Sequence, residues 1–345
     1  MSDQTSMGQL RRSANDAQEA FVDKLLHVVR RFAPGAQKIE KLVRLSGGAS
    51  QEIWSFAVLN DHGLDRIILR RAPVGAQIVD KIDLETEAAV LSAAENAGVP
   101  SPHVHYVLKP EDELGRGFFM THVEGEALGR KIVRDEQFAA IRPRLAFRAG
   151  ETLAKIHAID LEKLPSLPTI TPAEDVATLY ENYRQWSDPR PVVELAFRWI
   201  RERMPPADNP MRLVHGDFRN GNMLIGPDGI AAVLDWELAH VGDPMRDLGW
   251  ICTAAWRYSE IDKPVGGFGE REDLVAGYEA AGGAKVQPDV LRFWELMGSI
   301  RWGVFCMGMG FRAKQSDRPV EMSMIGRRAS ENEIDIMRLL APRDA

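Results

Sequence analysis

The chain has 345 residues, of which 45% are hydrophobic and 27% are charged, so its composition is that of a folded globular protein and excludes general disorder. Its 43 basic and 50 acidic residues give a net charge of −7, which argues against a nucleic-acid partner. Two cysteines, Cys252 and Cys306, are too few for a disulfide framework and lack metal-ligand spacing. The length predicts about two domains.

The N-terminal segment is polar and lacks the apolar stretch of a secretory signal. No apolar run in the sequence is long enough to span a bilayer. Together with the low cysteine content, these features predict a cytoplasmic protein without a membrane partner.

The first third of the chain is predicted to form an antiparallel sheet. Apolar residues at helical spacing predict a first helix that starts near Asn15 and stops at Pro34-Gly35. Short β-prone segments between turn residues then predict five strands, at 41–45, 53–59, 66–70, 104–107 and 117–123. A helix over 82–96, closed by Gly98, separates the third strand from the fourth.

The rest of the chain is predicted to be mainly helical, with one small β element. The expected helices cover 138–159, 244–256, 272–281, 290–312 and 333–340. Between the first two lies a strand at 213–215 and a hairpin whose strands cover 223–225 and 230–234. The pattern predicts two domains, 1–123 and 124–345. Three glycines and a proline in 258–269 favour a mobile loop.

The stretch from His215 to Asp247 carries the strongest functional signal. It reads His-Gly-Asp-Phe-Arg-Asn-Gly-Asn, then the hairpin, then Leu-Asp-Trp-Glu. A hairpin can bring the loop before its first strand close to the residues after its second. Asp217, Asn222, Asp235 and Glu237 would then converge, and such hard oxygen ligands suit Mg²⁺.

This stretch resembles the catalytic segment of the aminoglycoside phosphotransferase and choline kinase family. The resemblance is closest to bacterial members related to the kinase domains fused to acyl-CoA dehydrogenase-like enzymes. It implies an α+β, bilobal protein-kinase-like fold, with a five-stranded antiparallel N-terminal lobe that binds the nucleotide and a larger helical C-terminal lobe. It also implies an ATP- and Mg²⁺-dependent kinase that phosphorylates a hydroxyl of a small molecule.

The resemblance assigns roles residue by residue. Asp217 matches the catalytic base, which accepts the proton of the substrate hydroxyl. Asn222 and Asp235 match the metal ligands, and Glu237 is a further candidate ligand. Asp247 matches the aspartate that holds the backbone of the catalytic loop from a following helix. We expect His215 to orient the same loop by hydrogen bonding.

The nucleotide-binding residues are expected in the first domain. Ser46, Gly47, Gly48 and Ser50 lie between two strands, where kinases place their phosphate-covering loop. Arg70 stands where the family usually has a phosphate-binding lysine, and arginine keeps the charge. Its partner would be Glu87 rather than Glu85, and Arg71 would point to the opposite face of the strand.

The segment 119–123 matches the hinge strand, whose backbone would bind adenine. Met120 and His122 are the candidate residues within it. The phosphate acceptor is open between two classes, a hydroxyacyl-CoA and an amino sugar or aminoglycoside-like molecule. Basic residues near the C-terminus mildly favour the hydroxyacyl-CoA. These residues are Arg312, Lys314, Arg318, Arg327 and Arg328.

Two other functions remain open on the sequence alone. A metal-dependent hydrolase would use His215, Asp217, Asp235 and His240 as ligands. A pseudokinase would bind nucleotide without turnover, and the arginine at position 70 is its best support. The hairpin and the Asn222 spacing count against the first, and the intact Asp217 counts against the second.

Overall fold

The computed structural model describes residues 18–47, 51–72, 81–206, 209–316 and 318–341. The chain divides into two compact units. The first comprises Met1–Ser92 and Pro102–Val123, and the second comprises Ala93–Ser101 and Glu124–Ala345. Each unit is described by itself below.

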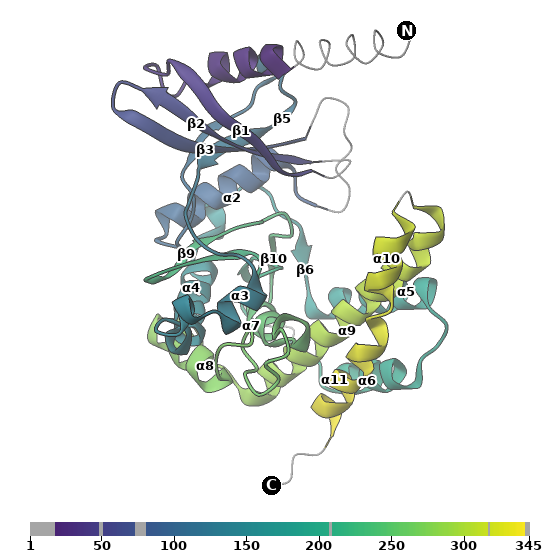
Figure 1. The fold of residues 1–345 in the computed structure, drawn as a ribbon. Helices are drawn as coiled ribbons and strands as arrows, with labels where there is room; N and C mark the ends of the chain where they lie inside the picture. The colour runs from purple at the N-terminus through teal and green to yellow at the C-terminus, as the bar shows by residue number, and fades with distance from the viewer. Residues whose placement is uncertain (1–17, 48–50, 73–80, 207–208, 317, 342–345) are drawn as a thin grey trace. The chain divides into compact units, whose positions relative to one another are not determined.

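The first unit is built on a five-stranded antiparallel sheet, as predicted (Figure 1). Its strands are β1 (Lys38–Gly47), β2 (Glu52–Asn60), β3 (Gly63–Ala72), β4 (Val104–Val107) and β5 (Arg116–Thr121), in the spatial order β1-β2-β3-β5-β4. The β2–β3 turn is tight because Asn60 pairs with Gly63, and Gly63 has a φ of 129°, which favours glycine. Apart from β4, the strands differ from the predicted ones by one to three residues at their ends.

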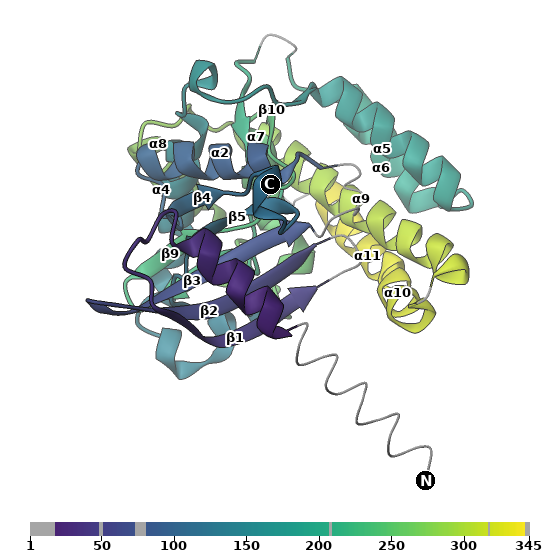
Figure 2. The same ribbon diagram turned by 90° about the horizontal axis from the view of Figure 1, so that it is seen from above.

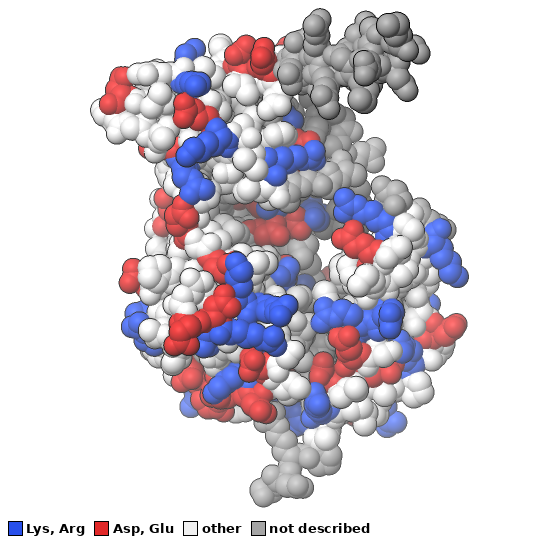
Figure 3. Space-filling view, viewed as in Figure 1, with Lys and Arg blue, Asp and Glu red and all other residues white. Residues whose placement is uncertain are grey.

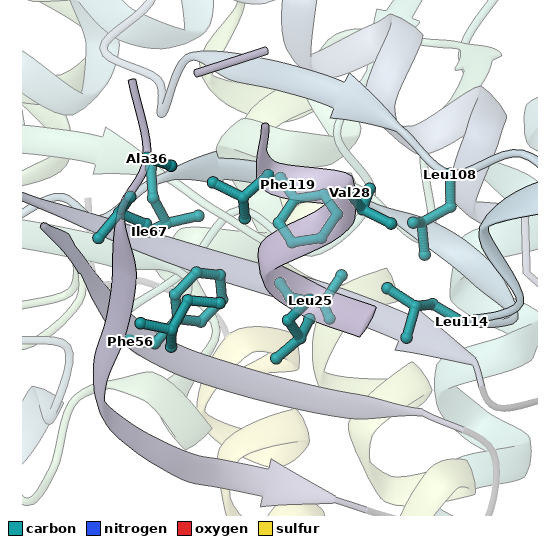
Figure 4. Packing of buried hydrophobic residues seen from close by; sticks show 12 residues of the cluster. Leu25, Val28, Ala36, Phe56, Ile67, Leu108, Leu114 and Phe119 are labelled. Atoms are coloured by element: carbon teal, nitrogen blue, oxygen red, sulfur yellow. The ribbon is translucent and has the colours of Figure 1, made fainter. Parts of the chain in front are cut away.

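The two faces of this sheet have different neighbours. A helix over residues 18–29 lies across one face, and Figure 2 shows it from above. Leu25 and Val28 of this helix pack there with Phe56, Ile67 and Phe119 in one hydrophobic cluster (Figure 4). Because side chains alternate along a strand, the residues next to Ile67 point to the other face. Arg70 lies on that other face and contacts the helix α2 (Leu84–Asn96).

The second unit is mainly helical and contains two small β elements (Figure 1). Its longer helices are α4 (Leu145–His157), α5 (Pro172–Trp186), α6 (Pro191–Glu202), α7 (Met245–Cys252), α8 (Arg271–Ala280), α9 (Pro288–Arg312), α10 (Pro319–Gly326) and α11 (Ala329–Leu340). A short α3 (Gly129–Arg134) precedes them. None of the described helices is both long enough and apolar enough to cross a lipid bilayer.

The β elements of the second unit frame a loop. Strands β6 (Thr169–Ile170), β10 (His240–Gly242) and β7 (Arg212–Val214) form one sheet in that order. Strands β8 (Met223–Gly226) and β9 (Gly229–Val233) form the predicted hairpin. The loop 215–222 therefore runs between β7 and β8. Neither β6 nor β10 was expected from the sequence.

The helix predicted over 138–159 is confirmed over 145–157 as α4, but its first part is wrong. The chain forms two short 3-10 turns, Glu136–Phe138 and Arg142–Arg144, before α4 begins at Leu145. Pro143 sits in the second turn and lacks the N–H that a continuous helix would need.

Helices α5 and α6 were not assigned from the sequence, although α5 carries a clear start signal. The Thr171 side chain accepts from the Glu174 N–H, and the Glu174 side chain accepts from the Thr171 N–H. This capping box, with Pro172 at the first helical position, is legible in the sequence.

Two glycines bring α4 and α8 into backbone contact. A Cβ atom at Gly150 would lie 2.1 Å from the Leu274 carbonyl oxygen, and one at Gly277 would lie 2.0 Å from the Phe147 carbonyl oxygen. Any larger residue at either position would push the two helices apart. Because α4 ends at His157, this packing also sets the position of that histidine.

The sequence favours a mobile loop over 258–269, but the second half of this segment is packed inside the protein. Residues 264–269 are buried, and Val265 forms a β-bridge with Gly269. The side chain of Asn220 donates hydrogen bonds to the carbonyl oxygens of Trp256 and Gly266. The segment is thereby tied to the loop between β7 and β8.

Candidate active site

Asp217 lies at the centre of the loop between β7 and β8, where three side chains donate to its carboxylate. The Asn222 Nδ2 atom donates to Oδ2 over 2.6 Å. The Trp250 Nε1 atom, from α7, donates to Oδ1 over 2.7 Å, and the Arg219 Nε atom donates to the same oxygen over 2.9 Å. The position and rotation of this carboxylate are therefore fixed from both of its oxygens.

The hairpin brings the residues after β9 back to this loop, as predicted. Met223 pairs with Val233, and the Leu234 N–H donates to the Asn222 carbonyl oxygen over 2.8 Å. Asp235 follows directly and has a φ of 65°, in the left-handed region. Outside glycine this conformation is uncommon, and it turns the chain sharply at the end of β9. Asp235 and Glu237 are both half-buried.

Asp247 fixes the backbone of the loop. It is fully buried in α7, and its carboxylate accepts the His215 N–H over 2.8 Å and the Gly216 N–H over 2.9 Å. The predicted contact is therefore present. His157 Nε2 lies 3.2 Å from the same carboxylate, and the Tyr278 hydroxyl lies 3.0 Å from His157 Nδ1.

The surroundings of Asp247 keep it ionised. Burial by itself would raise the pKa of the Asp247 carboxyl. The hydrogen bonds of His157 and of the His215 backbone N–H outweigh burial, so this pKa lies below its ordinary value. A charged Asp247 can accept the two backbone N–H groups throughout the neutral pH range.

The two histidines proposed for a hydrolase have their ring nitrogens bonded within the protein. His215 Nε2 donates to the Leu234 carbonyl oxygen over 3.1 Å, and His215 Nδ1 accepts the Asp217 N–H over 3.2 Å. His240 Nδ1 donates to the Leu238 carbonyl oxygen, and His240 Nε2 accepts from Arg246. His215 therefore orients the loop by hydrogen bonding, as expected.

Burial lowers the pKa of both histidines, which stay neutral at pH 7. Across the described ranges, no three His, Cys, Asp or Glu side chains are grouped so that they could hold a metal ion. The four-ligand site of the hydrolase alternative is therefore not formed.

A magnesium site of the kinase type needs fewer protein ligands. Mg²⁺ is usually bound by one or two protein oxygens and completes its shell with water and phosphate oxygens. Because the Asn222 Nδ2 group donates to Asp217, the Oδ1 atom of the same side chain remains to face a cation. This oxygen and the Asp235 carboxylate are donors of the right chemistry. Glu237, two residues further on, stays a candidate ligand.

In the first unit, Arg70 and Glu87 form a buried ion pair. The Arg70 Nε and Glu87 Oε2 atoms are 3.2 Å apart, and both side chains are almost fully buried. Glu85 pairs instead with the exposed Arg116. Arg71 pairs with Glu52, its direct partner across the β2–β3 ladder. The choice of Arg70 and Glu87 over their neighbours is therefore supported by the contacts each residue makes.

The glycine-rich segment falls partly outside the described residues. Ser46 and Gly47 are the last residues of β1, where they pair with Ile53 and Glu52. Gly48 and Ser50 lie outside the described residues, so the prediction of a phosphate-covering loop stays a prediction.

The residues predicted to form the hinge, Met120 and His122, lie at or just after the end of β5. Met120 pairs with Ile68 on one side and Val104 on the other, within the sheet. The His122 N–H donates to the Arg66 carbonyl oxygen over 3.0 Å. Because that donor is engaged, His122 would have to serve a bound ring through its other atoms.

Two residues that donate to Asp217 were not predicted from the sequence. Arg219 lies inside the predicted catalytic motif, two residues from Asp217, but was assigned no role. Trp250 follows Asp247 by three residues on α7, and no local pattern links it to Asp217. The contact between His157 and Asp247 was also not predicted, because it depends on the tertiary fold.

Comparison with known proteins adds a family to this geometry. The sequence profile described as "Phosphotransferase enzyme family" matches residues 41–287, which is more than half of the chain. Among curated proteins, acyl-CoA dehydrogenase family member 10 of Mus musculus is 29% identical over 201 residues. The match covers 55% of this chain and 18% of that protein, so the chain corresponds to a minor part of that relative.

Solved structures show the same fold. A putative aminoglycoside phosphotransferase from Ralstonia eutropha has a TM-score of 0.69 and 19% identity, covering 92% of this chain and 98% of that one. An aminoglycoside phosphotransferase in a ternary complex with ADP and hygromycin B has a TM-score of 0.61 and 17% identity, covering 92% and 98%. The predicted protein-kinase-like fold is therefore confirmed.

Proposed function

Because this chain belongs to the phosphotransferase enzyme family, we propose that it is an ATP- and Mg²⁺-dependent kinase that phosphorylates a hydroxyl group of a small molecule. The observation that carries the proposal is the joined set of Asp217, Asn222 and Asp235. Asn222 binds the Asp217 carboxylate through its side chain and the residue before Asp235 through its backbone. The similar structure with bound ADP supports a nucleotide as phosphate donor.

Each residue of the set has a distinct task. Asp217 accepts the proton of the acceptor hydroxyl as its oxygen attacks the terminal phosphorus. Asn222 and Asp235 hold the metal, with Glu237 as a further candidate, and bound Mg²⁺ neutralises charge on the phosphates. Arg70, fixed by Glu87, provides the cation for the phosphates in the first unit. Ser46, Gly47, Gly48 and Ser50 cover the phosphates, and the hinge at Met120 and His122 receives the adenine.

A row of contacting arginine and tryptophan side chains next to Asp217 favours one acceptor class. The guanidinium of Arg219 lies 4.5 Å from the centre of the Trp256 ring, which is 5.0 Å from the Trp302 ring. The guanidinium of Arg328 lies 5.4 Å from the Trp302 ring. Trp302 is half-buried and Trp256 is buried, and the guanidiniums at the two ends also pair with Asp217 and Glu331. A site lined by arginine and tryptophan side chains suits an anionic acceptor with an apolar chain better than a polycationic amino sugar.

Two further observations bear on the acceptor. The visible surface of the helical unit mixes Lys and Arg with Asp and Glu instead of presenting a single acidic face (Figure 3). The relative from Mus musculus is named as an acyl-CoA dehydrogenase family member. We therefore propose a hydroxyacyl-CoA as the acceptor class, ahead of an amino sugar.

A thermal-shift titration with ATP, with and without Mg²⁺, tests the nucleotide site. Wild type and Asp217→Asn should both show a magnesium-dependent rise in Tm, equivalent to about 2.7 kcal/mol at 100 times Kd. Asp235→Ala should lose the rise because it removes a metal ligand. Folded wild-type protein that shows no shift with any nucleotide would contradict the proposal.

Product analysis by mass then separates binding from chemistry. Wild type should transfer phosphate to a hydroxyacyl-CoA, and Asp217→Asn should be slower by about 10²–10⁴-fold while it still binds ATP. If Asp217→Asn retained full turnover, Asp217 would not be the base. If wild type phosphorylated only cationic amino sugars, the acceptor class would be wrong.

A further inference from the structure

Arg219 is held in a closed ring of contacts around one oxygen of Asp217. Its Nε atom donates to Asp217 Oδ1, and its guanidinium stacks on the ring of Trp256. Trp256 meets Trp250 edge to face, with ring centres 5.2 Å apart. Trp250 closes the ring by donating to the same Oδ1 atom. Arg219 therefore has a fixed place within the catalytic loop instead of reaching into solvent.

The donors leave one position open on the Asp217 carboxylate. A carboxylate has about four lone-pair sites, two on each oxygen. Arg219 and Trp250 fill both sites on Oδ1, and Asn222 fills one site on Oδ2. The remaining site, on Oδ2, is where an acceptor hydroxyl can donate its proton.

The loop also shapes the space that Arg219 occupies. A Cβ atom at Gly221 would lie 2.5 Å from Arg219 Nη1, so only glycine at 221 leaves this guanidinium where it is. Gly221 also has a φ of 103°, which favours glycine. Arg219 Nη1 donates to the Asn220 carbonyl oxygen over 2.8 Å. With Nε and Nη1 engaged inside the loop, the Nη2 group is the one left to meet a ligand.

We propose that Arg219 is a further catalytic residue, which directs the acceptor hydroxyl to Asp217 Oδ2 and binds the phosphoryl group in transit through Nη2. This inference rests on the proposed kinase function. In the step, the acceptor oxygen forms a bond to the γ-phosphorus while the bond from that phosphorus to the bridging oxygen of ADP breaks. The hydroxyl proton passes to Asp217 Oδ2, and ADP leaves with the electron pair of the broken bond.

The variants Arg219→Gln and Arg219→Lys test this role, and Arg203→Gln is the matched control. Arg203 also stacks on an indole, with its guanidinium 4.7 Å from the Trp199 ring, but it lies outside the loop. Arg219→Gln should lower kcat by about 10²–10³-fold, as removal of a transition-state donor does, with little change in the KM for ATP. Arg219→Lys keeps the charge without the planar set of guanidinium donors, so its kcat should lie between those of wild type and Arg219→Gln. Arg203→Gln should behave as wild type.

A binding measurement tests the contact without turnover. ADP with Mg²⁺ and fluoroaluminate imitates the phosphoryl group in transit, and calorimetry gives its affinity and that of ADP alone. In wild type and Arg203→Gln, fluoroaluminate should tighten ADP binding at least tenfold. In Arg219→Gln, ADP should bind as in wild type, and most of the tightening should be lost.

The other outcomes are distinct. Folded wild type that does not bind ADP would overturn the proposed function itself. ADP binding without tightening in wild type would overturn the role of Arg219 alone, and so would equal tightening in wild type and Arg219→Gln. A lower Tm in Arg219→Gln, with ADP and its fluoroaluminate complex weakened to the same degree, would indicate a purely structural residue.

Discussion

Two buried carboxylates, Glu87 in the sheet unit and Asp247 in the helical unit, are stabilised in different ways. Glu87 meets the side chain of Arg70 across two elements of the first unit. Asp247 accepts the backbone N–H groups of His215 and Gly216, and His157 contacts it from α4. The first contact depends on which side chain stands at one strand position. The second depends on the path of the main chain.

This difference bears on the expectation that Arg70 replaces a lysine of the family whereas Asp247 matches the family's aspartate. A cationic side chain that meets a carboxylate can be lysine or arginine, because both carry the charge. A carboxylate that accepts two successive backbone N–H groups has no such substitute. The helical unit should therefore be the less tolerant of change at its carboxylate, and three experiments test this contrast.

The largest effect is expected from Asp247→Asn. The amide cannot accept both backbone N–H groups and also meet His157 as a carboxylate does, so buried donors would lose their partner. The free energy of unfolding in urea should fall by about 4 kcal/mol. The exposed Asp273→Asn, on the first turn of α8, is the control and should change it by less than about 0.5 kcal/mol. A loss equally small in Asp247→Asn would show that the loop does not depend on this residue.

A pH titration of protein stability should reveal that the buried His240 is neutral in the folded protein. Burial, followed by the charge of Arg246, lowers the pKa of His240 to about 4. The unfolded chain has an ordinary histidine near 6.5 and takes up the proton first as the pH falls. The stability that His240 contributes is therefore complete above pH 6.5 and is lost between 6.5 and 4, by about 3 kcal/mol.

Urea unfolding at several pH values in this window measures the loss. His240→Gln cannot titrate, so its free energy of unfolding should vary less with pH than that of wild type. Parallel curves for the two proteins would assign the pH dependence to other groups.

The smallest effect is expected from Arg70→Lys. Lysine retains a cation beside Glu87, so phosphate transfer should stay within about tenfold of wild type. Arg70→Met removes the charge and should cost much more. The control is Arg71→Met, because Arg71 pairs with Glu52 and should leave the ATP-dependent rise in Tm unchanged. A severe loss in Arg70→Lys would show that the arginine fork is required, and the contrast between the two units would then be weaker.

Local sequence patterns predicted most of the fold. The strands were found because apolar residues alternate between turns of Gly and Asn, as at Asn60 and Gly63. The start of the helix predicted over 138–159 was wrong because the apolar spacing continues through Pro143, which breaks the backbone pattern. Strand β10 is defined by its pairing with β6 and β7, which the sequence around it does not reveal.

The candidate active site likewise contains residues that local patterns predict and residues that only the tertiary fold brings in. Asp217 and Asn222 lie in one contiguous motif, and a hairpin that the sequence also marks brings Asp235 to them. Trp250 reaches Asp217 from α7 and His157 reaches Asp247 from α4, and these contacts depend on how the helices pack. Gly150 and Gly277 control that packing through the close approach of α4 and α8. Such distant dependence is not visible in one sequence.

The left-handed backbone of Asp235 has a consequence for protein engineering. Glycine, and to a lesser degree asparagine, adopts a φ of 65° at less cost than aspartate does. A directed-evolution campaign that selected only for heat resistance would therefore tend to accept either residue at this position. The selected thermostable variants would then lack the carboxylate proposed to hold the metal. Any such selection therefore needs a parallel screen for catalytic activity.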